Sequence, residues 1–150
     1  MSASKEGITL PGETEDKCCW CIPIKIGVTV IGVFVLLSCV GVVFEGLGAM
    51  DYDSIFGILI LCTCAPIVLA GIKYVQWFKD DSQETRMGCS TACMLMIVAE
   101  LAVAAVYLVF ALTAASVEMS WALSYIIGAG ISSVIWFYYA GVCKRYAGQS

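Results

Sequence analysis

The sequence contains no histidine and no asparagine, and only 13% of its 150 residues are charged. The missing histidine removes the commonest general base and metal ligand. The missing asparagine excludes N-linked glycosylation, which needs an Asn acceptor. A soluble domain needs about a quarter of its residues charged to cover its surface. Together with 61% hydrophobic residues and a mean hydropathy of +0.92, the low charge indicates a chain surrounded mostly by lipid.

Residues 1–17 do not have the pattern of a secretory signal peptide, because they are polar and lack an apolar segment. Residue 2 is Ser rather than Gly, which excludes N-myristoylation. We therefore expect the first membrane-spanning helix to act as the targeting signal. The net charge of −4 comes mostly from short polar segments, so we expect no nucleic-acid partner.

Four apolar stretches are long enough to cross a bilayer, which takes about 20 residues in a helix. They cover approximately residues 24–44, 54–75, 89–115 and 121–142. Strand alternation is absent, and backbone polar groups in lipid must be satisfied within the chain, so we expect helices. We predict an all-α membrane protein: a tail over residues 1–23, an antiparallel four-helix transmembrane bundle over 24–142, and a tail over 143–150. Pro66 is expected to kink the second helix.

The positively charged residues are unevenly distributed among the connections. The first expected loop, Glu45–Asp53, and the third, Ser116–Ser120, contain no Lys or Arg. All eight basic residues lie in or beside the tails and the second loop: Lys5, Lys17, Lys25, Lys73, Lys79, Arg86, Lys144 and Arg145. Because cytosolic connections carry an excess of Lys and Arg, we expect both termini and the middle loop to be cytosolic.

Small residues recur at four-residue spacing in the fourth expected helix. Ser124, Gly128 and Ser132 form one flat face. Between helices in lipid there is little hydrophobic drive, so close packing over small residues matters. We expect this helix-packing face to contact the other helices of the same chain. The alternative is a self-association face between copies.

Glu100 is the one carboxylate that we expect far from both ends of a span. An ionised carboxylate there costs at least ~2.5–3.5 kcal/mol on insertion scales, so we expect it to be protonated or paired. No Lys or Arg is expected at the same depth. One interpretation is an intramembrane acidic site for a proton, a cation or a lipid headgroup. The other is a neutral Glu that shares hydrogen bonds with a hydroxyl such as Ser132, Thr63 or Thr29.

Nine cysteines are present, and none lies in the two expected outer loops. Juxtamembrane cysteines are sites of S-palmitoylation, and the candidates for lipidation are Cys18, Cys19, Cys21, Cys89 and Cys143. Plain reduced thiols are the alternative interpretation. A zinc site from Cys18, Cys21, Cys89 and Cys93 has plausible pair spacings but no intervening ligand pattern. We therefore expect neither a metal nor a cofactor.

Short motifs open or close the expected helices. They are Cys18-Cys19-Trp20-Cys21 with Lys25-Ile26-Gly27, then Gly71-Ile72-Lys73-Tyr74, Cys93 with Glu100, and Val142-Cys143-Lys144-Arg145-Tyr146-Ala147-Gly148. In these places the chain resembles the lysosome-associated transmembrane protein family. The resemblance implies a small tetraspan of endomembranes (endosome or lysosome) or the plasma membrane, with a sorting or lipid-binding role. The family's Pro-Pro-x-Tyr motifs, which recruit ubiquitin ligases, are absent from this sequence.

The residues do not suggest catalysis, because the sequence contains no His, no Gly-rich phosphate loop and no expected carboxylate pair inside the membrane. We expect a non-enzymatic tetraspan that acts as a membrane scaffold or accessory subunit through helix–helix association. Its partners would be the lipid bilayer and other membrane subunits or further copies of itself. Two alternatives remain: an endolysosomal lipid-binding or sorting protein, and a small transporter or channel subunit that uses Glu100.

Overall fold

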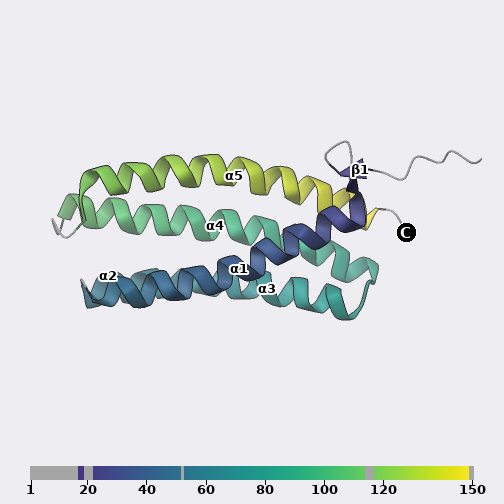
Figure 1. The fold of residues 1–150 in the computed structure, drawn as a ribbon, viewed down its shortest axis with the longest axis horizontal. Helices are drawn as coiled ribbons and strands as arrows, with labels where there is room; N and C mark the ends of the chain where they lie inside the picture. Colours follow the sequence, from purple (N-terminus) through teal and green to yellow (C-terminus); the bar gives the residue numbers. More distant parts are fainter. Residues whose placement is uncertain (1–16, 19–21, 52, 114–116, 149–150) are drawn as a thin grey trace, which may run out of the picture.

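Helices make up nearly all of the residues that the structure, a computed structural model, describes: 17–18, 22–51, 53–113 and 117–148. Over these residues the helices are α1 (Ile24–Met50), α2 (Ser54–Cys62), α3 (Cys64–Lys79), α4 (Gln83–Thr113) and α5 (Met119–Ala147). Two-residue strands, β1 (Lys17–Cys18) and β2 (Ile22–Pro23), pair antiparallel before α1. Figure 1 shows the helices side by side in an elongated bundle.

Four helical segments of the described chain are long and apolar enough to cross a bilayer: Ile24–Met50, Ser54–Lys79, Gln83–Thr113 and Met119–Ala147. They confirm the prediction of a multi-pass helical membrane protein with four spans. Large apolar side chains remain exposed along them, among them Phe44 at 70% and Val134 at 71%. In water this exposure would be costly, whereas lipid solvates it without a penalty.

The helices are longer than the apolar stretches. Helix α1 continues to Met50 where the sequence predicts an end near residue 44, and α5 continues to Ala147 rather than to about 142. Helix α4 begins at Gln83 rather than near 89. A 27-residue helix is about 40 Å long, so its ends extend beyond the ~30 Å hydrocarbon layer. As a result Glu45, expected in a loop, lies in α1 one to two turns before its end.

The predicted kink at Pro66 is confirmed as a break between α2 and α3. Pro66 has no N–H to donate to the carbonyl of Cys62, and helix α2 ends at that residue. The hydroxyl of Thr63, which is 7% exposed, donates a hydrogen bond of 2.6 Å to the carbonyl of Ile60. The same carbonyl also accepts the backbone N–H of Thr63 at 3.0 Å, so both bonds tighten the last turn of α2 at the break.

The start of α1 and the end of α5 lie at the same end of the bundle, as does the α3–α4 connection (Figure 1). We call this the basic end, because the Lys and Arg side chains of α1, α3, α4 and α5 lie within about two turns of it. The opposite end, which holds the α1–α2 and α4–α5 connections, we call the loop end.

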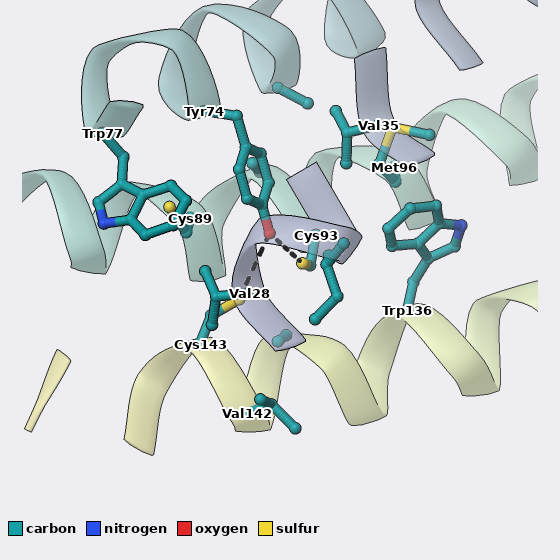
Figure 2. Close-up of a cluster of buried hydrophobic side chains, with 14 of the residues drawn as sticks. Val28, Val35, Tyr74, Trp77, Cys89, Cys93, Met96, Trp136, Val142 and Cys143 are labelled. Atoms are coloured by element: carbon teal, nitrogen blue, oxygen red, sulfur yellow. Dashed lines mark hydrogen bonds between the residues drawn. The ribbon is translucent and has the colours of Figure 1, made fainter. Parts of the chain in front are cut away.

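Helix α1 crosses the bundle, starting beside α5 at the basic end and finishing beside α2 at the loop end (Figure 1). The crossing is close at Gly32, because a Cβ there would lie 2.6 Å from the ring of Tyr74 on α3. Figure 2 shows Tyr74 in the large buried cluster of the basic half, with its hydroxyl 3.6 Å from the sulfur of Cys93 and 3.4 Å from that of Cys143.

A second, smaller cluster is buried near the loop end: Ala49, Phe56, Ile60, Val103 and Phe110. Its side chains come from α1, α2 and α4, with Tyr125 of α5 packed against them. The core is therefore divided along the bundle, and the candidate site lies between its two parts.

Candidate intramembrane binding groove

A cavity of about 610 Å³ lies between α1 and α5, with α4 behind it. Ser38, Gly41 and Glu45 line it from α1, and Glu100 lines it from α4. On α5 it is lined mainly by the small-residue face and, nearer the loop end, by the aromatic residues Trp121 and Tyr125. Gly41, Ser124 and Gly128 are exposed, so the cavity is open along the side of the bundle. We call it the α1–α5 groove.

The small-residue face of α5 does not pack as the sequence predicts. A Cβ at Gly128 would meet no atom within 4 Å, and the hydroxyl of Ser124 bonds only to the carbonyl of Ser120 in its own helix. Only Ser132, at the basic side of the face, contacts a neighbouring helix through a hydrogen bond. The expectation of intramolecular packing is therefore wrong at Ser124 and Gly128, because α1 diverges from α5 before it reaches them.

Glu100 is anchored by two donors from one stripe of α5. The hydroxyl of Ser132 donates to Oε1 at 2.7 Å, and the indole Nε1 of Trp136 donates to the same oxygen at 2.8 Å. The other oxygen, Oε2, is buried and has no hydrogen-bond partner. Of the three hydroxyls considered from the sequence, Ser132 therefore makes the bond, while Thr29 and Thr63 bond to backbone carbonyls of their own segments.

A second carboxylate, Glu45, lines the same groove nearer the loop end. Its Oε1 accepts hydrogen bonds from the hydroxyls of Tyr107, at 2.9 Å, and Tyr125. These two rings stack with centroids 3.9 Å apart, which holds both hydroxyls on one side of the carboxylate. Glu45 therefore joins Glu100 in the lining of one cavity, an arrangement that the sequence did not indicate.

A second cavity, of about 470 Å³, lies at the loop end and is also lined by Glu45. Trp121 lines both cavities, so they meet at these two residues. Asp53 and Glu118 line the outer cavity. None of the described residues that line either cavity is a Lys or an Arg. The two cavities therefore present only acidic charge, from the loop end to the middle of the bundle.

At the basic end, Asp81 in the α3–α4 connection binds side chains from all four spanning segments. Its carboxylate accepts bonds from Lys25 of α1 at 3.0 Å, Trp77 of α3 at 2.9 Å, Arg86 of α4 at 2.7 Å and Tyr146 of α5 at 3.0 Å. The Arg86 guanidinium, helped by the other donors, holds the pKa of Asp81 well below its usual range. We call this arrangement the Asp81 clamp.

Two of the proposed lipidation sites are inaccessible. Cys89 and Cys143 are 0% exposed, as is Cys93 beside them. An acyltransferase cannot reach a thiol inside the helix bundle, so the prediction of lipidation at Cys89 and Cys143 is contradicted. The expected positions Cys19 and Cys21 lie outside the described residues, and the side chain of Cys18 is not described. Among the described residues no group of His, Cys, Asp or Glu side chains is arranged to hold a metal ion.

Comparison with known proteins identifies no relative: no family model, no curated protein and no solved structure matches this chain. The interpretation of the groove therefore depends on its own geometry.

The sequence pattern indicates Glu100 and the small-residue face but not Glu45, Trp136 or Asp81. Trp136 extends the stripe of Ser124, Gly128 and Ser132 by one more four-residue step, and that spacing was the signal available for it. The sequence places Glu45 in an expected loop because its charge follows an apolar stretch that runs to residue 44. Asp81 carried no distinguishing pattern, because its partners are brought together only by the fold.

Proposed function

We propose that this protein is a non-enzymatic tetraspan that acts as a scaffold or accessory subunit of a membrane assembly. It does so by receiving a further transmembrane helix in the α1–α5 groove. The observation that carries the proposal is that each side of the groove includes small residues that no helix of this chain covers. Gly41 on α1 and Gly128 on α5 each have no atom within 4 Å of a Cβ position.

In lipid, helices associate through close backbone approach rather than through burial of apolar surface. A face built from Ser and Gly permits that approach, and within this chain two of its three residues, Ser124 and Gly128, are not used for packing. The part of the face that this chain leaves unpacked therefore borders either lipid or another protein. Close packing against a second helix offers van der Waals contact along the whole wall, which mobile acyl chains provide less well.

We propose that the basic end faces the cytosol, which places both termini there and makes the four spans antiparallel. The distribution of Lys and Arg supports this arrangement. The membrane would be an endosomal, lysosomal or plasma membrane, in line with the resemblance to the lysosome-associated family. The groove then opens in the half of the bilayer away from the cytosol.

The proposal is tested by the native mass of the protein after extraction from its own membrane in mild detergent. We expect a complex well above the 16.1 kDa of a single chain. Gly128→Leu should dissociate it, because a Cβ at this position meets no atom within 4 Å and the rest of the leucine side chain then occupies the groove. Gly130→Leu is the matched control: Gly130 also has no atom within 4 Å of a Cβ, but it does not line the groove.

A single 16.1 kDa species for the wild-type protein would overturn the proposal. So would equal loss of the complex in Gly128→Leu and Gly130→Leu, because the groove would then not be the docking surface.

A second candidate function is supported by the size of the groove. At about 610 Å³ it is within the range of small-molecule sites, and it combines an apolar lining with two carboxylates. A lipid-binding or sorting protein, or a transporter subunit that uses Glu100, would have such a site. Enrichment of one lipid class in the purified protein, or a flux that Glu100→Gln abolishes in vesicles, would favour this function over a helix-docking role.

A further inference from the structure

We infer that the helix received by the α1–α5 groove belongs to a different protein and carries a Lys or Arg that pairs with Glu100. This inference rests on the proposed function and specifies its partner. Three observations lead to it: the depth and incomplete hydrogen bonding of Glu100, the absence of any cation at that depth in this chain, and the shape of the groove.

Glu100 lies deep in the bilayer and is only half satisfied. Along α4 it is about 25 Å from Gln83 and about 20 Å from Thr113 at the helical rise. Both of its donors bind Oε1, and the buried Oε2 has none. A buried acceptor without a donor is costly in a medium of low dielectric constant. The fold of this chain therefore holds the carboxylate in place and leaves one of its bonds to be made by something else.

This chain cannot supply the missing cation. Its eight basic residues all lie in or near the tails and the α3–α4 connection. A second copy in the same membrane has its basic residues at the same depths, so a homo-oligomer does not place a cation beside Glu100. The hydroxyls that a second copy exposes at Ser38 and Ser124 already bond to carbonyls of their own helices, so they compete poorly with a cation for Glu100. The donor therefore comes from another protein.

The groove suits a helix that carries a long basic side chain. Ser38 and Gly41 form one wall and Ser124 and Gly128 the other, so the backbone of an incoming helix can approach from the side. The space between the walls is large enough for a Lys or Arg side chain of the incoming helix. Glu100 lies at the base of this space. The terminal torsion of a Glu side chain is broad, so rotation of the carboxylate can present either oxygen to the cation.

Charge complementarity favours a basic partner over a neutral one. The groove contains Glu45 as well as Glu100 and no basic side chain. A Lys or Arg alone in the bilayer is costly, as a carboxylate alone is, and pairing the two with good geometry and further hydrogen bonds offsets part of both penalties. A partner of this kind is unstable in the membrane until it assembles, which makes the pairing selective as well as favourable.

The test uses the full-length protein in lipid vesicles with synthetic transmembrane peptides as probes. One peptide is a Leu/Ala helix with a single Lys at its centre, and its control has Gln at that position. Energy transfer between labelled protein and labelled peptide measures binding. We expect the Lys peptide to bind at least about tenfold more tightly than the Gln peptide. The preference should disappear in Glu100→Gln, which keeps an oxygen for Ser132 and Trp136, and should persist in the control Glu84→Gln.

Three other outcomes would each overturn the inference, and the variants and probes distinguish them. Equal binding of both peptides, with both blocked by Gly128→Leu, would refute the charge pairing and leave helix docking in the groove intact. Binding of neither peptide, with Glu100-dependent binding of dodecylammonium, would refute a helix partner in favour of a small cationic ligand. A Lys preference that survives Glu100→Gln would show that the cation pairs elsewhere.

Discussion

Replacement of Asp81 should loosen the basic end of the whole bundle, because one carboxylate joins all four spanning segments. In Asp81→Ala, the indole of Trp77 and the hydroxyl of Tyr146 lose their acceptor. Both residues are 4% exposed, so water cannot easily replace it. An unsatisfied buried donor costs about 1–3 kcal/mol, which predicts a loss of about 2–6 kcal/mol from the two together. The ion pair with the exposed Lys25 adds little, because water screens it.

Asp81→Asn separates hydrogen bonding from charge. It keeps one acceptor oxygen for Trp77 and Tyr146 but removes the charge that binds Arg86. We therefore expect it to destabilise the protein less than Asp81→Ala does. The assay is thermal or denaturant unfolding in detergent or nanodiscs, with Glu84→Ala as an exposed acidic control on α4. If Asp81→Ala unfolds with the same free energy as Glu84→Ala, the clamp does not stabilise the bundle and the reasoning fails.

The same clamp predicts a pH dependence. The pKa of Asp81 is lower in the folded protein than in the unfolded chain, so its contribution to stability is complete above the unfolded value of about 4. As the pH falls below about 4, the unfolded chain takes up the proton first and this stabilisation is lost. The unfolding temperature of the wild-type protein should fall over that range more steeply than that of Asp81→Asn. Parallel curves would contradict the assignment.

Three further predictions concern packing, polar anchoring and thiol access. Gly32→Ala should destabilise the bundle by about 1–3 kcal/mol in the same unfolding assay, because its Cβ would lie 2.6 Å from the Tyr74 ring, whereas Gly41→Ala, with open space around it, should be near neutral. Glu100→Leu should cost about 1–3 kcal/mol more than Glu100→Gln, because it leaves the indole of the buried Trp136 without an acceptor; equal stabilities would argue against that bond. A membrane-permeant maleimide should modify Cys89 and Cys143 only after denaturation in SDS, and mass spectrometry should find no palmitate on either; labelling of the folded protein would contradict their burial.

The helices themselves follow from composition, and so does their number. In lipid a backbone has no water to bond to, so an apolar stretch of this length must become a helix whatever its neighbours are. The break before Pro66 is equally local, because it depends on one missing N–H. Helix ends were less predictable: the Glu45 side chain interrupts the apolar stretch after residue 44, yet the helix continues to Met50 because a single Glu does not break a helix.

The contacts between helices were not predictable in the same way. In a soluble protein an apolar stripe shows which face of a helix is buried. Here apolar residues lie on every face of a helix, so no such stripe distinguishes the face that packs against other helices. The four-residue spacing of Ser124, Gly128 and Ser132 correctly indicated a face of α5 and did not indicate what would cover it. Glu100 was expected to bond to a hydroxyl at a similar depth, and depth alone could not choose Ser132 over Thr63 or Thr29.

By itself the sequence determined that lipid surrounds this chain, that four helices cross it, and that positive charge gathers at one end. These properties depend on the solvation of each segment separately. The tertiary structure alone decided that α1 crosses from α5 to α2, which opens the groove and brings Glu45 to the same cavity as Glu100. It also decided that Asp81 meets Lys25 and Tyr146, which lie 56 and 65 residues away along the chain. Such contacts depend on how whole helices pack, and no local pattern encodes that.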